Sequence, residues 1–142
     1  MSAGYSGTPL ARKLGIEEGH LVAALWAPDH FPDLVAPLPH GVRLRSDLRG
    51  RAPHDVLVAF VRSEGQLPGR FDRAREKLDP HGGLWIAWPK QSSDLATSLK
   101  ESHVRQYGLS TGLVDNKICA IDEDWSGLRF VVRTADRPPK RR

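Results

Sequence analysis

Six residues that could bind a ligand stand at the predicted ends of apolar, strand-like runs in this 142-residue sequence. They are Asp29, Arg62, Ser63, Lys90, Asp122 and Trp125. Ligands of parallel sheets bind beyond the carboxyl ends of the strands, so these side chains would share one edge. The ammonium and guanidinium groups suit a phosphate or carboxylate, and the indole suits a planar group. The pattern predicts a site for a small anionic or planar ligand.

The same residues also permit a purely structural interpretation. Lys90 and Asp122 could pair across adjacent strand ends, while Trp125 fixes the turn between the last two strands. Both interpretations place the residues at the same edge of the sheet. They differ in whether a ligand completes the charge balance.

Several catalytic and metal-binding patterns are missing from the sequence. The six histidines show no paired metal-ligand spacing, and the single Cys119 cannot complete a zinc site. Ser6 and Ser126 each neighbour a glycine, but neither has the strand–turn–helix context of a nucleophile elbow. Cys119 lies in an apolar run, which favours a small buried side chain over a reactive thiol. We therefore predict no metal site and name no catalytic residue.

The net charge of +4 comes mainly from the end of the chain. Four of the 21 basic residues lie in segment 137–142, so the rest of the chain has 17 basic and 17 acidic residues. A nucleic-acid binder more often has a basic face interleaved with aromatic residues. Nucleic-acid binding is thus expected only if the tail provides it.

Length and composition predict one folded unit. The hydrophobic share of 39% and charged share of 27% are ordinary for a globular protein, and no apolar run reaches membrane-spanning length. The first residues lack the basic start and apolar stretch of a signal peptide. A single cysteine excludes an intrachain disulfide and fits a reducing compartment. We expect a cytoplasmic α/β domain over residues 1–135, with a short N-terminal helix, and a disordered basic tail over 136–142.

Apolar runs of strand length alternate with helix signals along the chain. Strands are expected at 21–27, 42–45, 56–61, 84–88, 116–121 and 128–132, and helices at 9–14, 29–35, 66–78 and 98–110. Thr8 would cap the first helix, and Ser98 with Glu101 would form a capping box for the last. Alternation of this kind predicts right-handed crossovers and a parallel sheet. We expect a three-layer Rossmann-like fold of six strands, the last reversed to form an antiparallel hairpin.

Segments 14–20 (LGIEEGH) and 78–84 (LDPHGGL), together with the terminal hairpin, resemble the Rossmann-like methyltransferases that use S-adenosylmethionine. The likeness is one of fold, and fold alone does not define function. The sequence departs from that family at the cofactor loop, where residues 27–31 (APDHF) contain no glycine. No acidic–proline–aromatic tetrapeptide follows Val61, where Arg62 and Ser63 stand instead. Asp47 could hold a ribose, but its neighbours Arg45 and Arg49 favour a surface ion pair. We therefore predict no cofactor.

A second resemblance covers residues 3–133. Segments 4–10 (GYSGTPL), 88–90 (WPK), 111–117 (TGLVDNK) and 120–130 (AIDEDWSGLRF) are similar to a bacterial family known as domain of unknown function 3052. This resemblance implies a shared architecture without an activity. Its motif residues of unknown role are Tyr5, Ser6, Thr8, Asp115, Asn116 and Lys117. For the last three, a polar helix-to-strand turn is the main interpretation and a protein partner the alternative.

The leading hypothesis is a non-catalytic accessory or regulatory protein. It would bind a small ligand or a protein partner at the carboxyl edge of its sheet. One alternative is an enzyme acting on a small anionic metabolite, with Lys90 and Asp122 as polar participants, including a divergent S-adenosylmethionine-dependent methyltransferase. A further alternative assigns the basic tail to nucleic acid.

Overall fold

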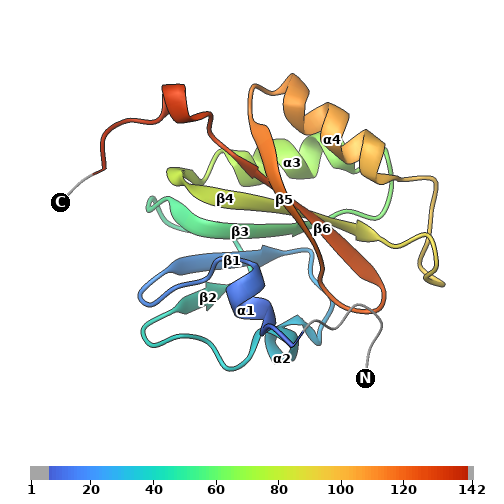
Figure 1. Ribbon diagram of the computed structural model, residues 1–142, viewed down its shortest axis with the longest axis horizontal. Helices are drawn as coiled ribbons and strands as arrows, with labels where there is room; N and C mark the ends of the chain where they lie inside the picture. Colours follow the sequence, from blue (N-terminus) through green and yellow to red (C-terminus); the bar gives the residue numbers. More distant parts are fainter. Residues whose placement is uncertain (1–6, 141–142) are drawn as a thin grey trace.

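All six strands form a single sheet in the order β2-β1-β3-β4-β6-β5 (Figure 1). The computed structural model describes residues 7–140. Its strands are β1 Leu21–Leu25, β2 Arg43–Arg45, β3 His54–Phe60, β4 Leu78–Pro89, β5 Val114–Ala120 and β6 Trp125–Val131. Its helices are α1 Leu10–Lys13, α2 Phe31–Val35, α3 Leu67–Arg75, α4 Glu101–Ser110 and the 3-10 turn η1 Thr134–Asp136. Five strands run parallel and β6 runs against them between β4 and β5, which confirms the predicted α/β architecture.

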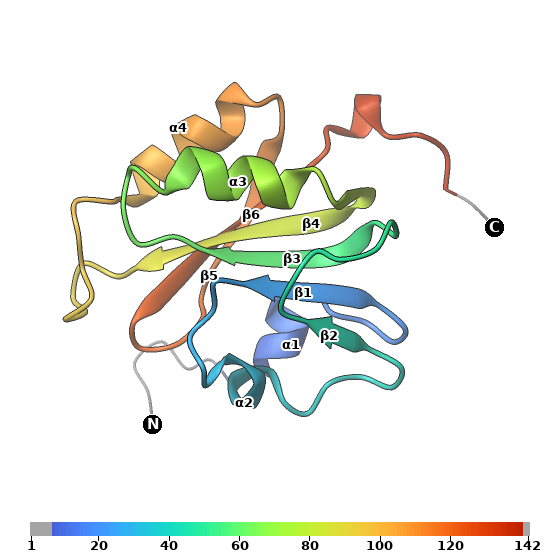
Figure 2. The same cartoon turned by 180° about the vertical axis from the view of Figure 1, so that it is seen from behind.

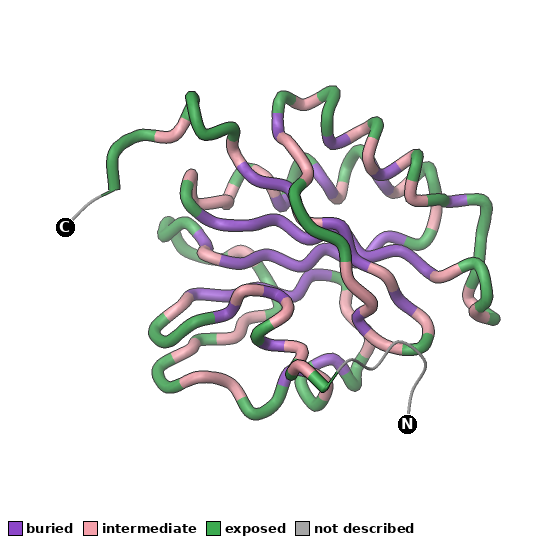
Figure 3. The backbone as a smooth tube through the Cα atoms, viewed as in Figure 1, coloured by how far each residue is buried: buried purple, intermediate pink, exposed green. Residues whose placement is uncertain are grey.

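The helices cover the two faces of the sheet and enclose two cores. Helices α3 and α4 pack on one face, and α1 and α2 on the other (Figure 2). Strand β3 supplies both cores, because Val56, Val58 and Phe60 face one and Leu57 and Ala59 face the other. This burial explains why its sequence is continuously apolar. The buried residues follow the central strands (Figure 3), and β3 lies between β1 and β4.

The predicted C-terminal end of the helix over 66–78 was wrong, and so was the predicted start of the strand over 84–88. Helix α3 ends at Arg75, and β4 already begins at Leu78. A Cβ atom at Gly82 would lie 2.5 Å from the carbonyl oxygen of Asp55, and one at Gly83 would meet the Arg129 side chain. These glycines permit close approach within a strand, whereas the sequence pattern indicated a helix stop.

Two predicted caps were also wrong. Pro9 takes the N-cap position of α1, and no side chain of residues 7–140 caps that helix. Helix α4 begins at Glu101, but Ser98 Oγ donates to Glu64 Oε2 at 2.6 Å instead of capping it. At this end, the Lys100 backbone N–H donates to His103 Nδ1 at 3.0 Å.

Strand β5 is an edge strand, so Cys119 is only half-buried and does not lie in the predicted apolar interior. Desolvation still raises the pKa of its thiol.

At the end of the chain, two residues of the predicted basic tail contact the folded body. The Arg137 Nε group donates to the Val132 carbonyl at 2.8 Å, and His81 Nε2 lies 2.7 Å from the Pro138 carbonyl. Among residues 7–140, no helix has the length and apolar character needed to cross a membrane.

Candidate ligand-binding edge of the sheet

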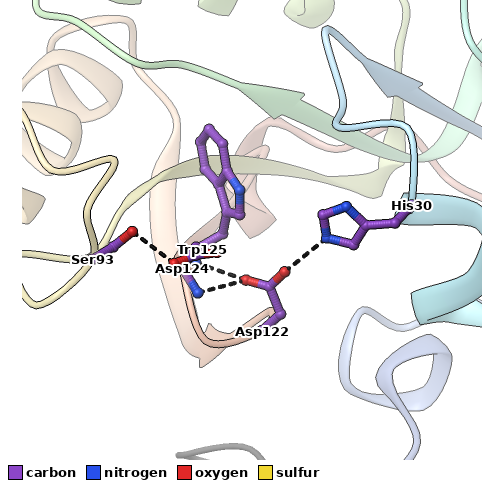
Figure 4. Close-up of polar contacts among 5 residues, drawn as sticks. All are labelled: His30, Ser93, Asp122, Asp124 and Trp125. Carbon is purple, nitrogen blue, oxygen red and sulfur yellow. Dashed lines mark hydrogen bonds and ion pairs between the residues drawn. The ribbon is translucent and has the colours of Figure 1, made fainter.

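The turn between β5 and β6 meets the loop after β1 at the carboxyl edge of the sheet. Asp122 Oδ2 lies 3.1 Å from His30 Nε2, although the two residues are 92 positions apart (Figure 4). Asp122 Oδ1 accepts the backbone N–H groups of Asp124 at 2.8 Å and Trp125 at 2.9 Å. Its side chain is only 14% exposed. The sequence correctly placed Asp122 at this edge, and its carboxylate is engaged by the protein itself.

Neighbouring polar groups also stabilise this turn. Ser93 Oγ donates to Asp124 Oδ1 at 2.7 Å, and the Lys90 backbone N–H donates to the Asp124 carbonyl at 2.8 Å. The predicted ion pair between Lys90 and Asp122, both of them in the described part of the chain, does not form. The Lys90 side chain instead lines a hollow of about 480 Å³ next to Lys100 and Ser126.

Trp125 belongs to a row of packed aromatic rings beneath this edge. It is 4% exposed, so its indole offers no face to a ligand, contrary to the ligand-binding interpretation. Its ring lies 4.9 Å from that of Phe60, which lies 5.4 Å from Phe31, both in edge-to-face geometry. Phe31, the first residue of α2, thereby fills space below the end of β1.

A cation–π pair bridges the crevice between the ends of β1 and β3. Trp26 follows β1 with φ of 56°, a left-handed conformation that is rare for a bulky residue. The Arg70 guanidinium of α3 lies 4.8 Å from the centre of the Trp26 ring. Its Nη1 also donates to the Phe60 carbonyl at the end of β3, at 2.8 Å. Open α/β sheets bind ligands where the winding reverses, which here is between β1 and β3. The protein's own side chains occupy that place.

A cavity of about 530 Å³ lies next to this crevice, between the carboxyl ends of β1 and β2. Its walls combine apolar and polar side chains: Trp26, Phe31, Pro32 and Leu44 with Asp29, Arg45 and Ser46. Of the predicted ligand-binding residues, only Asp29 lies there. Trp26 and Arg45 were missed because a tryptophan after a strand resembles a core residue, and paired arginines resemble a charged edge.

A second hollow, of about 550 Å³, adjoins the cavity. The two share Leu44, Arg45 and Ser46, and the second adds Asp47, Arg49 and Gly50. A larger hollow of about 620 Å³ lies elsewhere, beside α1 and the loop that precedes β1. Ligands of open sheets bind at the carboxyl ends, so the larger hollow is not the candidate site.

Arg62 and Ser63 help to begin α3 and are not gathered into the cavity. The Arg62 backbone N–H donates to Gln66 Oε1 at 2.9 Å, and Ser63 Oγ accepts the Gln66 N–H at 3.3 Å. The Arg62 side chain is exposed. These contacts give both residues a local structural role.

Asp115, Asn116 and Lys117 lie at the opposite, amino edge, as predicted. Asp115 Oδ2 accepts from Arg105 Nε at 3.1 Å, and Arg105 also pairs with Glu101 at 2.7 Å. These hydrogen bonds raise the pKa of the Arg105 guanidinium. Asn116 Oδ1 accepts weakly from Arg129 at 3.4 Å, and Lys117 is exposed. Asp115 therefore ties β5 to α4 and does not only shape a local turn.

The remaining motif residues stand near the N-terminus. Thr8 is half-buried before α1, and Tyr5 and Ser6 lie outside the described residues.

Comparison with known proteins identifies the fold class. No family model and no curated protein sequence matches this chain. A methyltransferase from Aquifex aeolicus that depends on S-adenosylmethionine is similar, with TM-score 0.54, 13% identity, and 85% of this chain and 86% of that one covered. The N-methyltransferase NodS of Bradyrhizobium japonicum gives TM-score 0.56, 15% identity and coverage of 92% and 93%.

Fibrillarin of Aeropyrum pernix, solved with natively bound S-adenosyl-L-methionine, gives TM-score 0.58 at 17% identity. The match covers 86% of this chain and 73% of fibrillarin. The chain therefore has the Rossmann-like fold of S-adenosylmethionine-dependent methyltransferases. At these identities the likeness concerns the fold alone.

The residues at the crevice do not fit S-adenosylmethionine. A close cofactor needs exposed backbone, which glycine provides, whereas residues 26–30 of this loop contain none. Trp26 and Arg70 bridge the crevice above, and Phe31 fills the space beneath. Among residues 7–140, no group of three His, Cys, Asp or Glu side chains could hold a metal ion.

Proposed function

We propose that this chain is a non-catalytic accessory or regulatory protein that binds a small molecule in the cavity between β1 and β2. The supporting observation is the contrast at one edge of the sheet. The crevice at the reversal point is closed by Trp26, Arg70 and Phe31, while the neighbouring cavity of about 530 Å³ is open. A fold that binds ligands at this edge thus retains one place for them.

The composition of the cavity supports this proposal. Small-molecule sites have volumes of roughly 300–1,000 Å³ and apolar walls with a few polar groups. Phe31, Pro32 and Leu44 supply apolar wall here, and Asp29 and Arg45 supply opposite charges. Such a site could orient a small polar molecule.

A thermal-shift screen tests the proposal. Nucleotides, acidic metabolites and S-adenosylmethionine would each be added to the purified protein over a concentration series. A ligand of the folded state at one hundred times its Kd stabilises it by about 2.7 kcal/mol, which raises Tm by several degrees. For at least one class of ligand, we expect Tm to rise with ligand concentration. A Tm that none of the ligand classes changes contradicts the proposal.

Paired proline variants locate the site. Pro32 and Pro68 are both exposed prolines in the first turn of a helix, but only Pro32 lines the cavity. Pro32→Trp adds an indole to the cavity wall and should weaken ligand binding about tenfold or more, by roughly 1.4 kcal/mol. Pro68→Trp should leave the affinity unchanged. Equal affinities for both variants would move the site elsewhere.

A divergent S-adenosylmethionine-dependent methyltransferase is the second candidate. The fold likeness supports it, and the glycine-free loop counts against it. Incubation of the pure protein with methyl-labelled S-adenosylmethionine and candidate acceptors separates the two functions. Label transferred to any acceptor establishes the enzyme, and binding without transfer favours the accessory protein.

Three further assignments remain proposals. The motifs at 4–10, 111–117 and 120–130 support membership in the bacterial family of domain of unknown function 3052. The single cysteine supports a cytoplasmic location. Nucleic-acid binding by the tail predicts affinity that falls steeply with salt and is lost when residues 137–142 are deleted.

A further inference from the structure

Arg45 stands at the carboxyl end of β2, on the boundary between the two adjoining hollows. One hollow is the cavity with Trp26 and Phe31, and the other contains Asp47 and Arg49. Ser46 lines both hollows together with Arg45. A ligand with two parts could therefore lie in the cavity and extend past Ser46 to the arginines.

The end of β2 is the most cationic part of this edge. Arg43, Arg45, Arg49 and Arg51 fall within nine residues that contain a single acidic residue, Asp47. Asp47 pairs with Arg49 at 3.5 Å. Arg45 forms no ion pair with any carboxylate among residues 7–140. Its guanidinium therefore has no carboxylate at ion-pair distance, although Asp29 lines the same cavity.

The local backbone holds Arg45 and Asp47 in place. Arg45 Nη1 donates to the Arg49 carbonyl at 3.0 Å. Gly50 has φ of 90° and lies next to this guanidinium. A Cβ atom at Gly50 would be 3.6 Å from Arg45 Nη1. Asp47 Oδ1 accepts the Arg49 backbone N–H at 3.1 Å, so it is engaged in the same turn. A held guanidinium loses little freedom when it binds an anion.

The residue type at the end of the second strand selects the ligand in doubly wound sheets. A carboxylate there accepts hydrogen bonds from a ribose diol, whereas an arginine accommodates a phosphate. We infer that the cavity takes a planar phosphomonoester, such as a nucleoside phosphate. The planar part lies against Trp26, whose side chain is 40% exposed, and the phosphate is bound by Arg45, the Ser46 hydroxyl and Arg49. This inference rests on the proposed small-molecule function and narrows it to one ligand class.

Calorimetric titration with AMP and adenosine tests the inference, since these probes differ only by the phosphate. AMP should bind about tenfold or more tightly than adenosine, because a charge-assisted guanidinium–phosphate contact is among the stronger hydrogen bonds. Arg45→Gln should reduce AMP affinity several-fold toward that of adenosine, with Ser46 and Arg49 still present, and should leave adenosine affinity unchanged. Arg43→Gln removes the same charge from the same strand, outside both hollows, and should change neither affinity.

The possible outcomes separate the two claims. Equal binding of AMP and adenosine that Pro32→Trp abolishes leaves the small-molecule function standing and overturns the phosphate assignment. Binding of AMP that Arg45→Gln weakens and Pro32→Trp does not supports the phosphate contact and overturns the cavity as the binding site. Equal losses in Arg45→Gln and Arg43→Gln indicate only general electrostatics and overturn the inference. So does the absence of binding by AMP, adenosine and inorganic phosphate at millimolar concentration. Unchanged circular dichroism and Tm confirm that each variant is folded.

Discussion

Two neighbouring regions of the carboxyl edge have opposite character. Between β1 and β3, Trp26, Arg70 and Phe31 fill the crevice with the protein's own side chains. Between β1 and β2, a cavity of about 530 Å³ stays open beside Arg45. The difference shows that a few large side chains can give two neighbouring parts of the same sheet edge different shapes. A function for this chain is therefore better sought at the second region.

Phe31→Ala should have the largest effect, because it removes the ring that fills the first region. Phe31 is 1% exposed and packs against Phe60, and such truncations cost about 3–5 kcal/mol of unfolding free energy. Urea unfolding monitored by tryptophan fluorescence measures the loss. The exposed neighbour Pro32→Ala should change stability by less than about 1 kcal/mol. Similar values for both would show that Phe31 does not close the crevice.

Asp122 and Asp29 compare a carboxylate that stabilises the turn between β5 and β6 with one that lines the open cavity. Asp122 accepts two backbone N–H groups, so Asp122→Ala leaves them without that acceptor and should cost about 1–3 kcal/mol. Asp29 is exposed and lines the open cavity, so Asp29→Ala should change stability by less than about 0.5 kcal/mol. Chemical denaturation checks both values. A larger loss of unfolding free energy for Asp29→Ala than for Asp122→Ala would show that Asp29 has a structural role and Asp122 does not.

Acid sensitivity should arise far from both regions, at the start of β3. His54 is fully buried, and neither ring nitrogen has a hydrogen-bond partner among the described residues. Desolvation lowers its pKa below the ordinary 6.5, so the unfolded chain binds more protons. Stability is then complete above about pH 6.5 and falls as pH drops through that value. The fall reaches at most about 1.4 kcal/mol per pH unit for one group.

The variant His54→Phe should flatten the loss of unfolding free energy between pH 6.5 and 5, as measured by urea titrations at each pH. In Phe31→Ala, the unfolding free energy should fall with pH at the same rate as in the native protein. Phe31 is not titratable and contributes only packing. A slope unchanged in His54→Phe would assign the acid sensitivity to other groups.

The smallest expected effect concerns the stack between Trp26 and Arg70. An exposed cation–π pair contributes about 0.5–1 kcal/mol. A double-mutant cycle with Trp26→Ala and Arg70→Met should give a coupling of that size, since the centres lie 4.8 Å apart. Unfolding free energies of the four proteins give the coupling. A value near zero would mean that the stack does not stabilise the closed crevice.

The sequence predicted the topology because its strongest signals are local and periodic. Residues 56–61 form an apolar run long enough for a doubly covered strand, and the spacing of Leu67, Phe71 and Ala74 defines one face of α3. Such patterns indicate which residues are buried and in what order strands and helices follow one another along the chain. They could not place the start of β4, because Gly82 and Gly83 indicate a turn unless the partner strand and Arg129 are known.

The site was harder to predict than the fold. Its character depends on side chains that meet across long separations, such as Trp26 with Arg70 and His30 with Asp122. The left-handed conformation of Trp26 also has no sequence signal, since glycine or asparagine normally marks that position. The strand pattern correctly placed Asp29 and Asp122 at the carboxyl edge of the sheet. It did not reveal that one carboxylate lines a cavity and the other closes a turn.

The position of β6 has a consequence for synthesis on the ribosome. This last strand lies between β4 and β5. One edge of β4 therefore has no hydrogen-bonding partner strand until Val131, the end of β6, has left the exit tunnel. Until then the nascent chain exposes unpaired peptide groups beside the buried strand around Trp85, which is the kind of surface that chaperones cover. We therefore expect the sheet to be completed only after β6 has been translated, and not while the earlier strands and helices leave the ribosome.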